Sequence, residues 1–190
     1  MLDEGRMRFE GSPDEIRNSP DYVIQQFIQG LERPHDALTG MATKVQGEKR
    51  VQEKLAHLQN HQIDFSVVML TVENLKELND RFGHVTGQTV LKKFAEKIQE
   101  RLGITDSCAR YSLDKILVVL HNAGIDDARN FSTGLAQGLR VQDLIAKPKD
   151  IDLTIRISAG YAQAEEGSLL RDVLMKAESK DSLYYEFLLK

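Results

Sequence analysis

The feature that most constrains the fold is an apolar, β-rich run at residues 64–72, which follows a helical pattern and precedes two more. Within residues 43–59, three apolar side chains recur at helical spacing. Residues 88–102 also place apolar side chains on one helical face and end at Gly103. A nearly continuous apolar strand is typical of the centre of a sheet that is covered by helices.

The rest of the chain extends this alternation of strands and helices. The further elements expected, in chain order, are a short helix containing Leu75 and Leu78, a β-hairpin of residues 108–111 and 116–121 joined by the polar connection 112–115, a helix capped by Asp126, a strand at 153–162 and a last helix from Ser168. The order α-β-α-α-β-β-α-β-α predicts an α/β (α+β) domain with a central, mainly antiparallel sheet flanked by helices.

Charge divides the chain into two parts. Residues 1–32 hold seven acids and three bases, whereas residues 33–190 hold 22 of each. We therefore expect an appendage at 1–32 and a domain at 33–190, with the boundary at Arg33-Pro34. The balanced charge of the domain argues against a nucleic-acid partner.

Hydropathy and the first residues bear on location. No apolar stretch approaches the roughly 18 to 20 residues that a membrane helix requires, so we expect no membrane insertion. The first residues lack the bases and the apolar core of a secretory signal, which favours a cytoplasmic location. The single cysteine, Cys108, lies in an apolar run and is expected to be a buried small side chain.

The appendage contains its own elements. Residues 1–9 are expected to form a short hairpin, and Ser12 is expected to cap a helix with Pro13 at its first position. A second short helix is expected after Pro20. These pieces carry more apolar surface than they can cover, which is typical of the edge of a larger domain.

Residues 75–88, LKELNDRFGHVTGQ, hold the most unusual motif. It resembles the FKxxNDxxGHxxGD motif of GGDEF domains, the bacterial diguanylate cyclase family. Six positions agree in one register: Lys76, Asn79, Asp80, Gly83, His84 and Gly87. Residues 36–40 are similar to the DxLTG opening of that family, and residues 157–162 to its SxGxA strand. The resemblance extends from residue 36 to residue 190 and implies the GGDEF fold.

The resemblance implies a site for GTP and a divalent metal held by carboxylates. One of the metal ligands of the family corresponds to Thr71, which cannot replace a carboxylate, and Glu73 lies two residues along in a displaced position. The signature GGDEF corresponds to Ser112, Leu113, Asp114, Lys115 and Ile116, in which only Asp114 is kept. We expect Leu113 to obstruct a nucleotide, and Lys115 reverses a charge.

Other contacts implied by the resemblance are also changed. The acid that helps to read guanine corresponds to Gln88, a phosphate-binding Lys to Glu178 and an Arg to Ser182. Lys76 and Asn79 match their counterparts and are the candidate nucleotide-binding residues, although a solvated Lys and a helix-capping Asn explain them nearly as well. The RxxD motif for product inhibition corresponds to residues 103–106, which lack the Arg.

Residues 1–30 have a separate resemblance, to the carboxyl-terminal end of the ATPase subunit of an ABC transporter of the Mla/MCE phospholipid type. The Walker motifs of such an ATPase are absent from this sequence, so ATP hydrolysis is not expected of it. We favour a fragment of a longer ATPase with a GGDEF-like extension. The implied partner is its own ATPase and transporter assembly, which would place the chain at the inner membrane as a peripheral component.

The sequence therefore predicts a catalytically inactive GGDEF-like regulatory or interaction domain, and no enzyme. One alternative is a GTP-sensing domain without turnover, and a less favoured one is a divergent diguanylate cyclase that makes cyclic di-GMP. No cofactor is expected, with Mg²⁺ only if a nucleotide binds. Asp114 is interpreted as a turn former and a vestigial metal ligand. A homodimer is left open.

Overall fold

The computed structural model describes residues 2–3, 6–7, 10–21, 24, 34–145, 154–179 and 184–189. The chain divides into two compact units, Met1–Pro34 and His35–Lys190, and each is described by itself.

The first unit contains a small hairpin and a capped helix. Strands β1 (Leu2–Asp3) and β2 (Arg6–Met7) pair in the antiparallel sense, and helix α1 spans Pro13–Arg17. The Ser12 hydroxyl accepts a hydrogen bond from the Glu15 amide at 3.3 Å, and the Glu15 carboxylate accepts one from the Ser12 amide at 2.7 Å. The expected hairpin and cap are confirmed. The second helix expected after Pro20 lies, apart from Ile24, outside the described residues.

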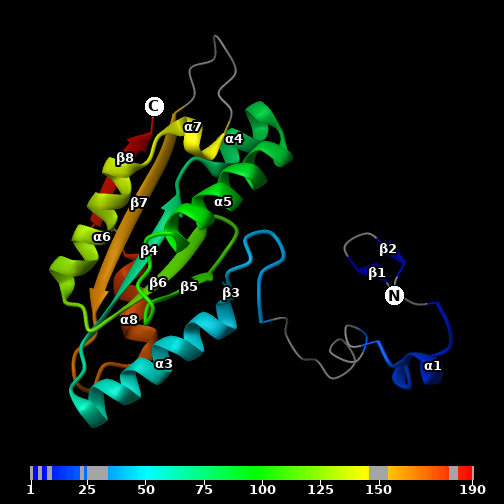
Figure 1. Cartoon of the computed structure of the whole chain (residues 1–190), viewed down its shortest axis with the longest axis horizontal. Coiled ribbons are helices and arrows are strands. Elements are labelled where there is room, and N and C mark those ends of the chain that lie inside the picture. Colours follow the sequence, from blue (N-terminus) through cyan, green and yellow to red (C-terminus); the bar gives the residue numbers. More distant parts are fainter. Residues whose placement is uncertain are drawn as a thin grey trace. The chain divides into compact units, whose positions relative to one another are not determined.

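The second unit is built on a six-stranded sheet with the order β3-β5-β6-β4-β7-β8 (Figure 1). Its strands are β3 (Ala42–Thr43), β4 (Phe65–Val72), β5 (Ser107–Arg110), β6 (Lys115–His121), β7 (Ile155–Gln163) and β8 (Tyr184–Leu189). Neighbouring strands pair in the antiparallel sense, except that β3 and β5 are parallel. The predicted class, α/β with a mainly antiparallel central sheet, is confirmed.

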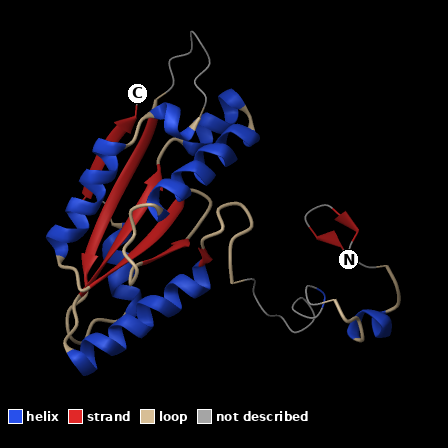
Figure 2. Cartoon of the chain, viewed as in Figure 1, coloured by secondary structure: helices blue, strands red, loops and turns tan. Residues whose placement is uncertain are grey.

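Helices cover both faces of this sheet (Figure 2). They are α3 (Lys44–His61), α4 (Leu75–Phe82), α5 (His84–Gln99), α6 (Ile125–Gly138), α7 (Val141–Leu144) and α8 (Leu170–Glu178). Apolar residues of α3 and α8 belong to one buried cluster, and those of α4, α5, α6 and α7 to the other.

Strand β4 separates the two clusters because its side chains alternate between the faces. Val68 and Leu70 join the cluster under α5, whereas Val67 and Met69 join the cluster under α3 and α8. The apolar run that dominates the sequence is therefore a strand buried on both faces, as expected.

Several boundaries differ from the sequence-based expectation. Strand β8 was not predicted, and α5 begins at His84 because the motif glycine Gly83 takes a positive φ of 86° that ends α4. Helix α6 begins after Gly124, and the carboxylate that accepts from the Gly124 amide, at 2.9 Å, is Asp127 and not Asp126.

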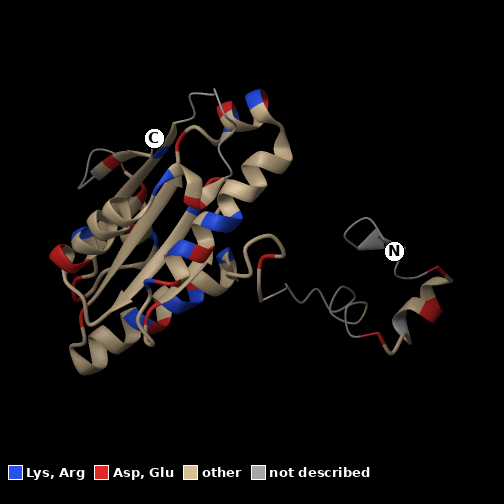
Figure 3. Ribbon diagram, turned by 45° about the horizontal axis from the view of Figure 1, so that its top comes forward, with Lys and Arg blue, Asp and Glu red and all other residues tan. Residues whose placement is uncertain are grey.

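Charged residues are interspersed over the helices (Figure 3). Several form pairs three or four residues apart, such as Arg50 with Glu53 and Lys93 with Glu96. In the described part of the chain, no helix is both long enough and apolar enough to cross a bilayer.

Candidate functional site

A pocket of about 160 Å³ lies between the end of β4, the start of β6, the middle of β7 and the end of α8. It is lined by Met69, Thr71, Glu73, Asp114, Lys115, Ser158, Gly160, Ala177 and Glu178. The signature hairpin, the strand that precedes α4 and the terminal helix therefore meet at one place. These are the three segments in which the resemblance placed metal and phosphate contacts.

Strand register explains why these side chains converge. Thr71 on β4 pairs with Lys115 on β6 and with Ser158 on β7, so the three residues form a row across the sheet. Residues paired across neighbouring strands point to the same face. That face is the one covered by α8.

Gly160 lets α8 approach the sheet closely. A Cβ atom at this position would lie 2.1 Å from the backbone oxygen of Ala177. Glu178 follows Ala177 directly, so the close approach brings the Glu178 side chain over the pocket. Gly160 belongs to the SxGxA-like strand, which gives that glycine a packing role.

The hairpin is held by its own polar contacts. The Asp114 carbonyl accepts a hydrogen bond from the Val72 amide at 2.9 Å, which fixes the turn against β4. The Ser112 hydroxyl donates to the Asp114 carboxylate at 2.8 Å, so Asp114 has a turn-forming contact as well as a place in the pocket. Leu113 is 84% exposed and does not line this pocket, and its expected obstruction of a nucleotide stays a prediction.

Arg110, which directly precedes the hairpin, has a structural role that was not expected from the sequence. Its guanidinium donates to the backbone carbonyls of Ser112 and Leu113 and so holds the turn. Burial lowers the pKa of Arg110, while the carboxylates of Asp36 and Asp114 act in the opposite direction. An arginine directly before the hairpin was the available signal.

The two charge-reversed positions contact each other. The Lys115 ammonium lies 2.7 Å from the Glu178 carboxylate, and both side chains are 31% exposed. Where the family has an acid on the hairpin and a lysine on the terminal helix, this chain has the opposite arrangement. The pair joins β6 to α8 and neutralises the charge that each residue would otherwise present.

Glu73 lines the same pocket as Asp114, although it follows β4. Its carboxylate accepts a hydrogen bond from the Ser158 hydroxyl at 2.6 Å. Among the described residues, no group of three or more His, Cys, Asp or Glu side chains is arranged to hold a metal ion. Mg²⁺ is often held by one or two carboxylates together with substrate phosphates, and Glu73 and Asp114 fit that donor set.

The other candidate residues, Lys76 and Asn79, lie on α4 and do not line this pocket. The Lys76 side chain is exposed. The Asn79 side-chain oxygen is buried and has no hydrogen-bond partner among the described residues. A Cβ atom at Gly87 would lie 2.0 Å from that oxygen, so the motif glycine on α5 makes room for the Asn79 amide. His84 is exposed at the start of α5.

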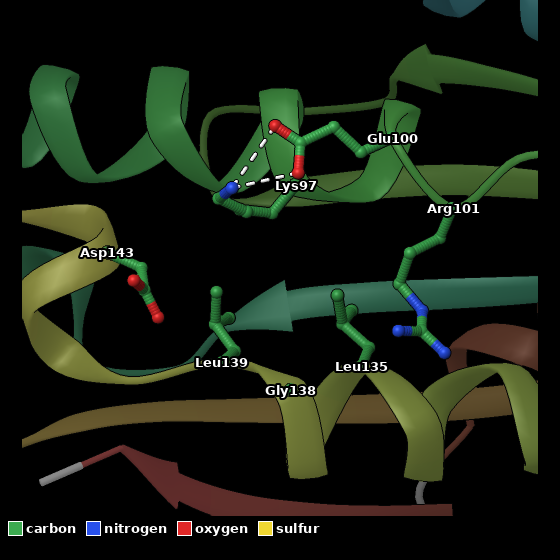
Figure 4. Close-up of a pocket in the computed structure, with 7 residues that line it drawn as sticks. All are labelled: Lys97, Glu100, Arg101, Leu135, Gly138, Leu139 and Asp143. Carbon is green, nitrogen blue, oxygen red and sulfur yellow. Dashed lines mark hydrogen bonds and ion pairs between the residues drawn. The ribbon is translucent and has the colours of Figure 1, made fainter.

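The segment that corresponds to RxxD has a structural role. The Asp106 carboxylate accepts hydrogen bonds from the amides of Gly103 at 2.8 Å and His121 at 2.9 Å. A second pocket, of about 150 Å³, lies near this segment between α5, α6 and α7 (Figure 4). It contains Arg101 and an ion pair of Lys97 with Glu100 at 2.8 Å.

Comparison with known families identifies the class. Residues 33–184 match the family described as "Diguanylate cyclase, GGDEF domain". This chain belongs to the GGDEF family, as the resemblance predicted.

Named relatives agree with this assignment. The chain is 32% identical over 107 residues to the diguanylate cyclase DgcS of Shewanella oneidensis, covering 54% of this chain and 36% of DgcS. It is 25% identical over 143 residues to the diguanylate cyclase DgcP of Pseudomonas aeruginosa, covering 75% of this chain and 21% of DgcP. The matches thus cover only a minor part of these relatives.

Solved structures show the same fold. The diguanylate cyclase SiaD of Pseudomonas aeruginosa, solved with its activator SiaC, has a TM-score of 0.69 at 23% identity, covering 82% of this chain and 60% of SiaD. The GGDEF domain of DgcB from Caulobacter crescentus, solved with cyclic di-GMP, also has a TM-score of 0.69, at 19% identity, covering 77% of this chain and 86% of that one.

The expectation that this chain is no enzyme is wrong. Its family is one of cyclases, and the relatives above are named as diguanylate cyclases. The expectation rested on the changed positions Thr71, Leu113, Lys115 and Glu178. Changes at these positions do not by themselves make a member of a cyclase family inactive, and two of them, Lys115 and Glu178, contact each other.

Proposed function

We propose that this GGDEF domain binds GTP together with a divalent cation at the pocket between the hairpin and α8, and that the Lys115–Glu178 ion pair controls access to it. The observation that carries the proposal is the 2.7 Å contact between these two side chains across the pocket of the signature hairpin. Because the family is one of diguanylate cyclases, cyclic di-GMP is the product for which an activity assay should be made.

The Lys115–Glu178 ion pair can separate at a small cost in free energy. Partly exposed ion pairs contribute about 0 to 1 kcal/mol to stability, since water solvates the separated charges well. A polyanionic ligand can therefore compete with Glu178 for the Lys115 ammonium at little cost in folding free energy. Released from Glu178, Lys115 is the basic side chain of this pocket that can contact a phosphate.

Glu73 and Asp114 would hold the cation. Bound there, Mg²⁺ would screen the phosphate charges from the surrounding carboxylates. Ser158 orients the Glu73 carboxylate through its 2.6 Å hydrogen bond, and Ser112 orients Asp114 at 2.8 Å. Lys76 and Asn79 on α4 are the proposed contacts for the rest of the nucleotide, and the exposed Lys76 side chain supports this proposal.

Calorimetric titration with GTP and Mg²⁺ tests this proposal. Glu178→Gln removes a negative charge and frees Lys115, so we expect GTP affinity to rise about tenfold. Lys115→Gln removes the ammonium group that faces the acidic side chains of the pocket, and we expect it to abolish detectable GTP binding. Glu96→Gln is the matched control, because it removes the same charge from an exposed ion pair on α5. Equal affinity in all four proteins would contradict the proposal.

We also propose that residues 1–32 end a separate domain, of the ABC-transporter ATPase type, and that GTP occupancy of the GGDEF domain regulates that ATPase in the cytoplasm. The division of the chain near residue 34 and the capped helix α1 support an independent unit. Affinity purification of the native gene product should recover a longer ATPase chain whose ATP hydrolysis responds to GTP. A native product that lacks ATPase motifs would contradict this proposal.

A further inference from the structure

A pair of histidines lies in the last turn of α3, away from the pocket described above. His57 and His61 are four residues apart, and both are exposed. Side chains at this spacing lie on the same face of a helix, one turn apart. Their ring centroids are 5.6 Å apart, with an angle of 62° between the ring planes.

This separation suits two imidazoles that bind one ion. With metal to nitrogen distances of about 2.0 to 2.1 Å and a tetrahedral angle, two coordinated rings have centroids about 5 Å apart. The observed separation is within reach of that value through small side-chain rotations. Exposure leaves the remaining coordination positions open to water, and no third protein ligand is present in the described residues.

The position in the helix also favours a cation. Helix α3 ends at His61, and Gln62 caps it in a left-handed conformation with φ of 53° while its amide donates to the Leu58 carbonyl at 2.9 Å. The carboxyl end of a helix carries a partial negative charge from its unpaired carbonyls. A divalent ion bound by the two rings would lie beside that charge.

We infer that His57 and His61 form a binding site for a late first-row transition-metal ion such as Ni²⁺ or Zn²⁺. Imidazole nitrogen suits these ions, whereas Mg²⁺ prefers oxygen ligands. The site lies at the Phe65 end of β4, roughly 20 Å along the strand from Thr71, so it is separate from the proposed nucleotide pocket.

Titration of the full chain with Ni²⁺ alone, in a buffer that does not chelate, tests the inference. We expect saturable binding that His57→Ala or His61→Ala weakens at least about tenfold. His84→Ala removes an exposed histidine from α5 and should leave the affinity unchanged.

A double variant provides a control of equal composition. Gln59→His combined with His61→Gln keeps the number of histidines but places them two residues apart, where helical side chains do not face each other. All the changed residues are exposed, so far-ultraviolet circular dichroism should show an unchanged fold. Loss of binding in this variant supports the site. Affinity equal to that of the unchanged chain, in this variant or in both alanine variants, would overturn it.

Discussion

Thr71 shows how much of the site depends on neighbours that are distant in sequence. From the sequence alone, Thr71 stands where the family has a carboxylate ligand of the metal, so that ligand is missing. In the structure it lies in a row between Lys115 and Ser158, and Glu73 lines the same pocket two residues later. The motif could be found from the sequence because its residues are contiguous. The Lys115–Glu178 pair could not be found from the sequence, because its members are 63 positions apart and only the fold brings them together.

Gly160 tests the close packing of α8 on the sheet. Gly160→Ala would place a Cβ atom 2.1 Å from a backbone oxygen, so α8 must shift, and we expect a loss of about 1 to 3 kcal/mol in the free energy of unfolding. Urea denaturation measures it. In Gly138→Ala, in the last turn of α6, the added Cβ atom would lie 3.7 Å from the nearest atom, Nη1 of Arg101, so stability should change by no more than about 0.5 kcal/mol. Equal effects would contradict the packing argument.

Cys108 is expected to be unreactive in the folded chain. Burial disfavours the thiolate and raises the pKa of Cys108 from 9.0 to about 11. The folded chain therefore keeps its proton where the unfolded chain loses it, so this group lowers stability as pH rises from 9 to 11. A thiol reagent at pH 8 should label the unfolded chain much faster than the folded one. Equal labelling rates would refute this prediction.

Apolar patterning predicted strands β4 to β7 and the long helices, and the polar connection between β5 and β6 predicted the hairpin. Strand β8 was missed because residues 184–189 follow the last recognised helix motif, although their run of aromatic and aliphatic residues was a strand signal. Helix α6 shows a different error. Asp126 was expected to cap it, whereas the helix begins after Gly124 and the carboxylate that accepts from the Gly124 amide belongs to Asp127.

Arg110 stabilises the turn between β5 and β6. Arg110→Ala removes donors to the carbonyls of Ser112 and Leu113, and we expect a loss of roughly 1.5 to 3 kcal/mol in unfolding free energy. Chemical denaturation measures it. Arg50→Ala, which breaks an exposed pair with Glu53, is the control and should cost less than about 1 kcal/mol. A smaller loss for Arg110 than for Arg50 would show that the turn does not depend on the guanidinium.

The whole molecule consists of two units, and the larger one encloses its own core. Both buried clusters consist of residues from Leu38 onward. The GGDEF class was predictable because a contiguous motif and the order of landmarks agreed. The effect of the changed positions on the pocket was not predictable, since it depends on how β4, β6, β7 and α8 pack against one another.

Removing residues 1–34 should therefore leave a folded GGDEF domain. We expect the chain from His35 onward to unfold cooperatively, because its sheet and both helical layers remain intact. Differential scanning calorimetry of the two chains checks this. Loss of the cooperative transition on truncation would mean that the first unit completes the core.

We propose that the Lys115–Glu178 pair controls access to a nucleotide pocket. Its most direct test is GTP affinity in the presence of Mg²⁺, measured by calorimetry for the unchanged chain and for Glu178→Gln. We expect saturable binding that is about tenfold tighter in the variant, because Lys115 is then free to contact phosphate. No binding in either protein, or equal binding in both, would contradict the claim.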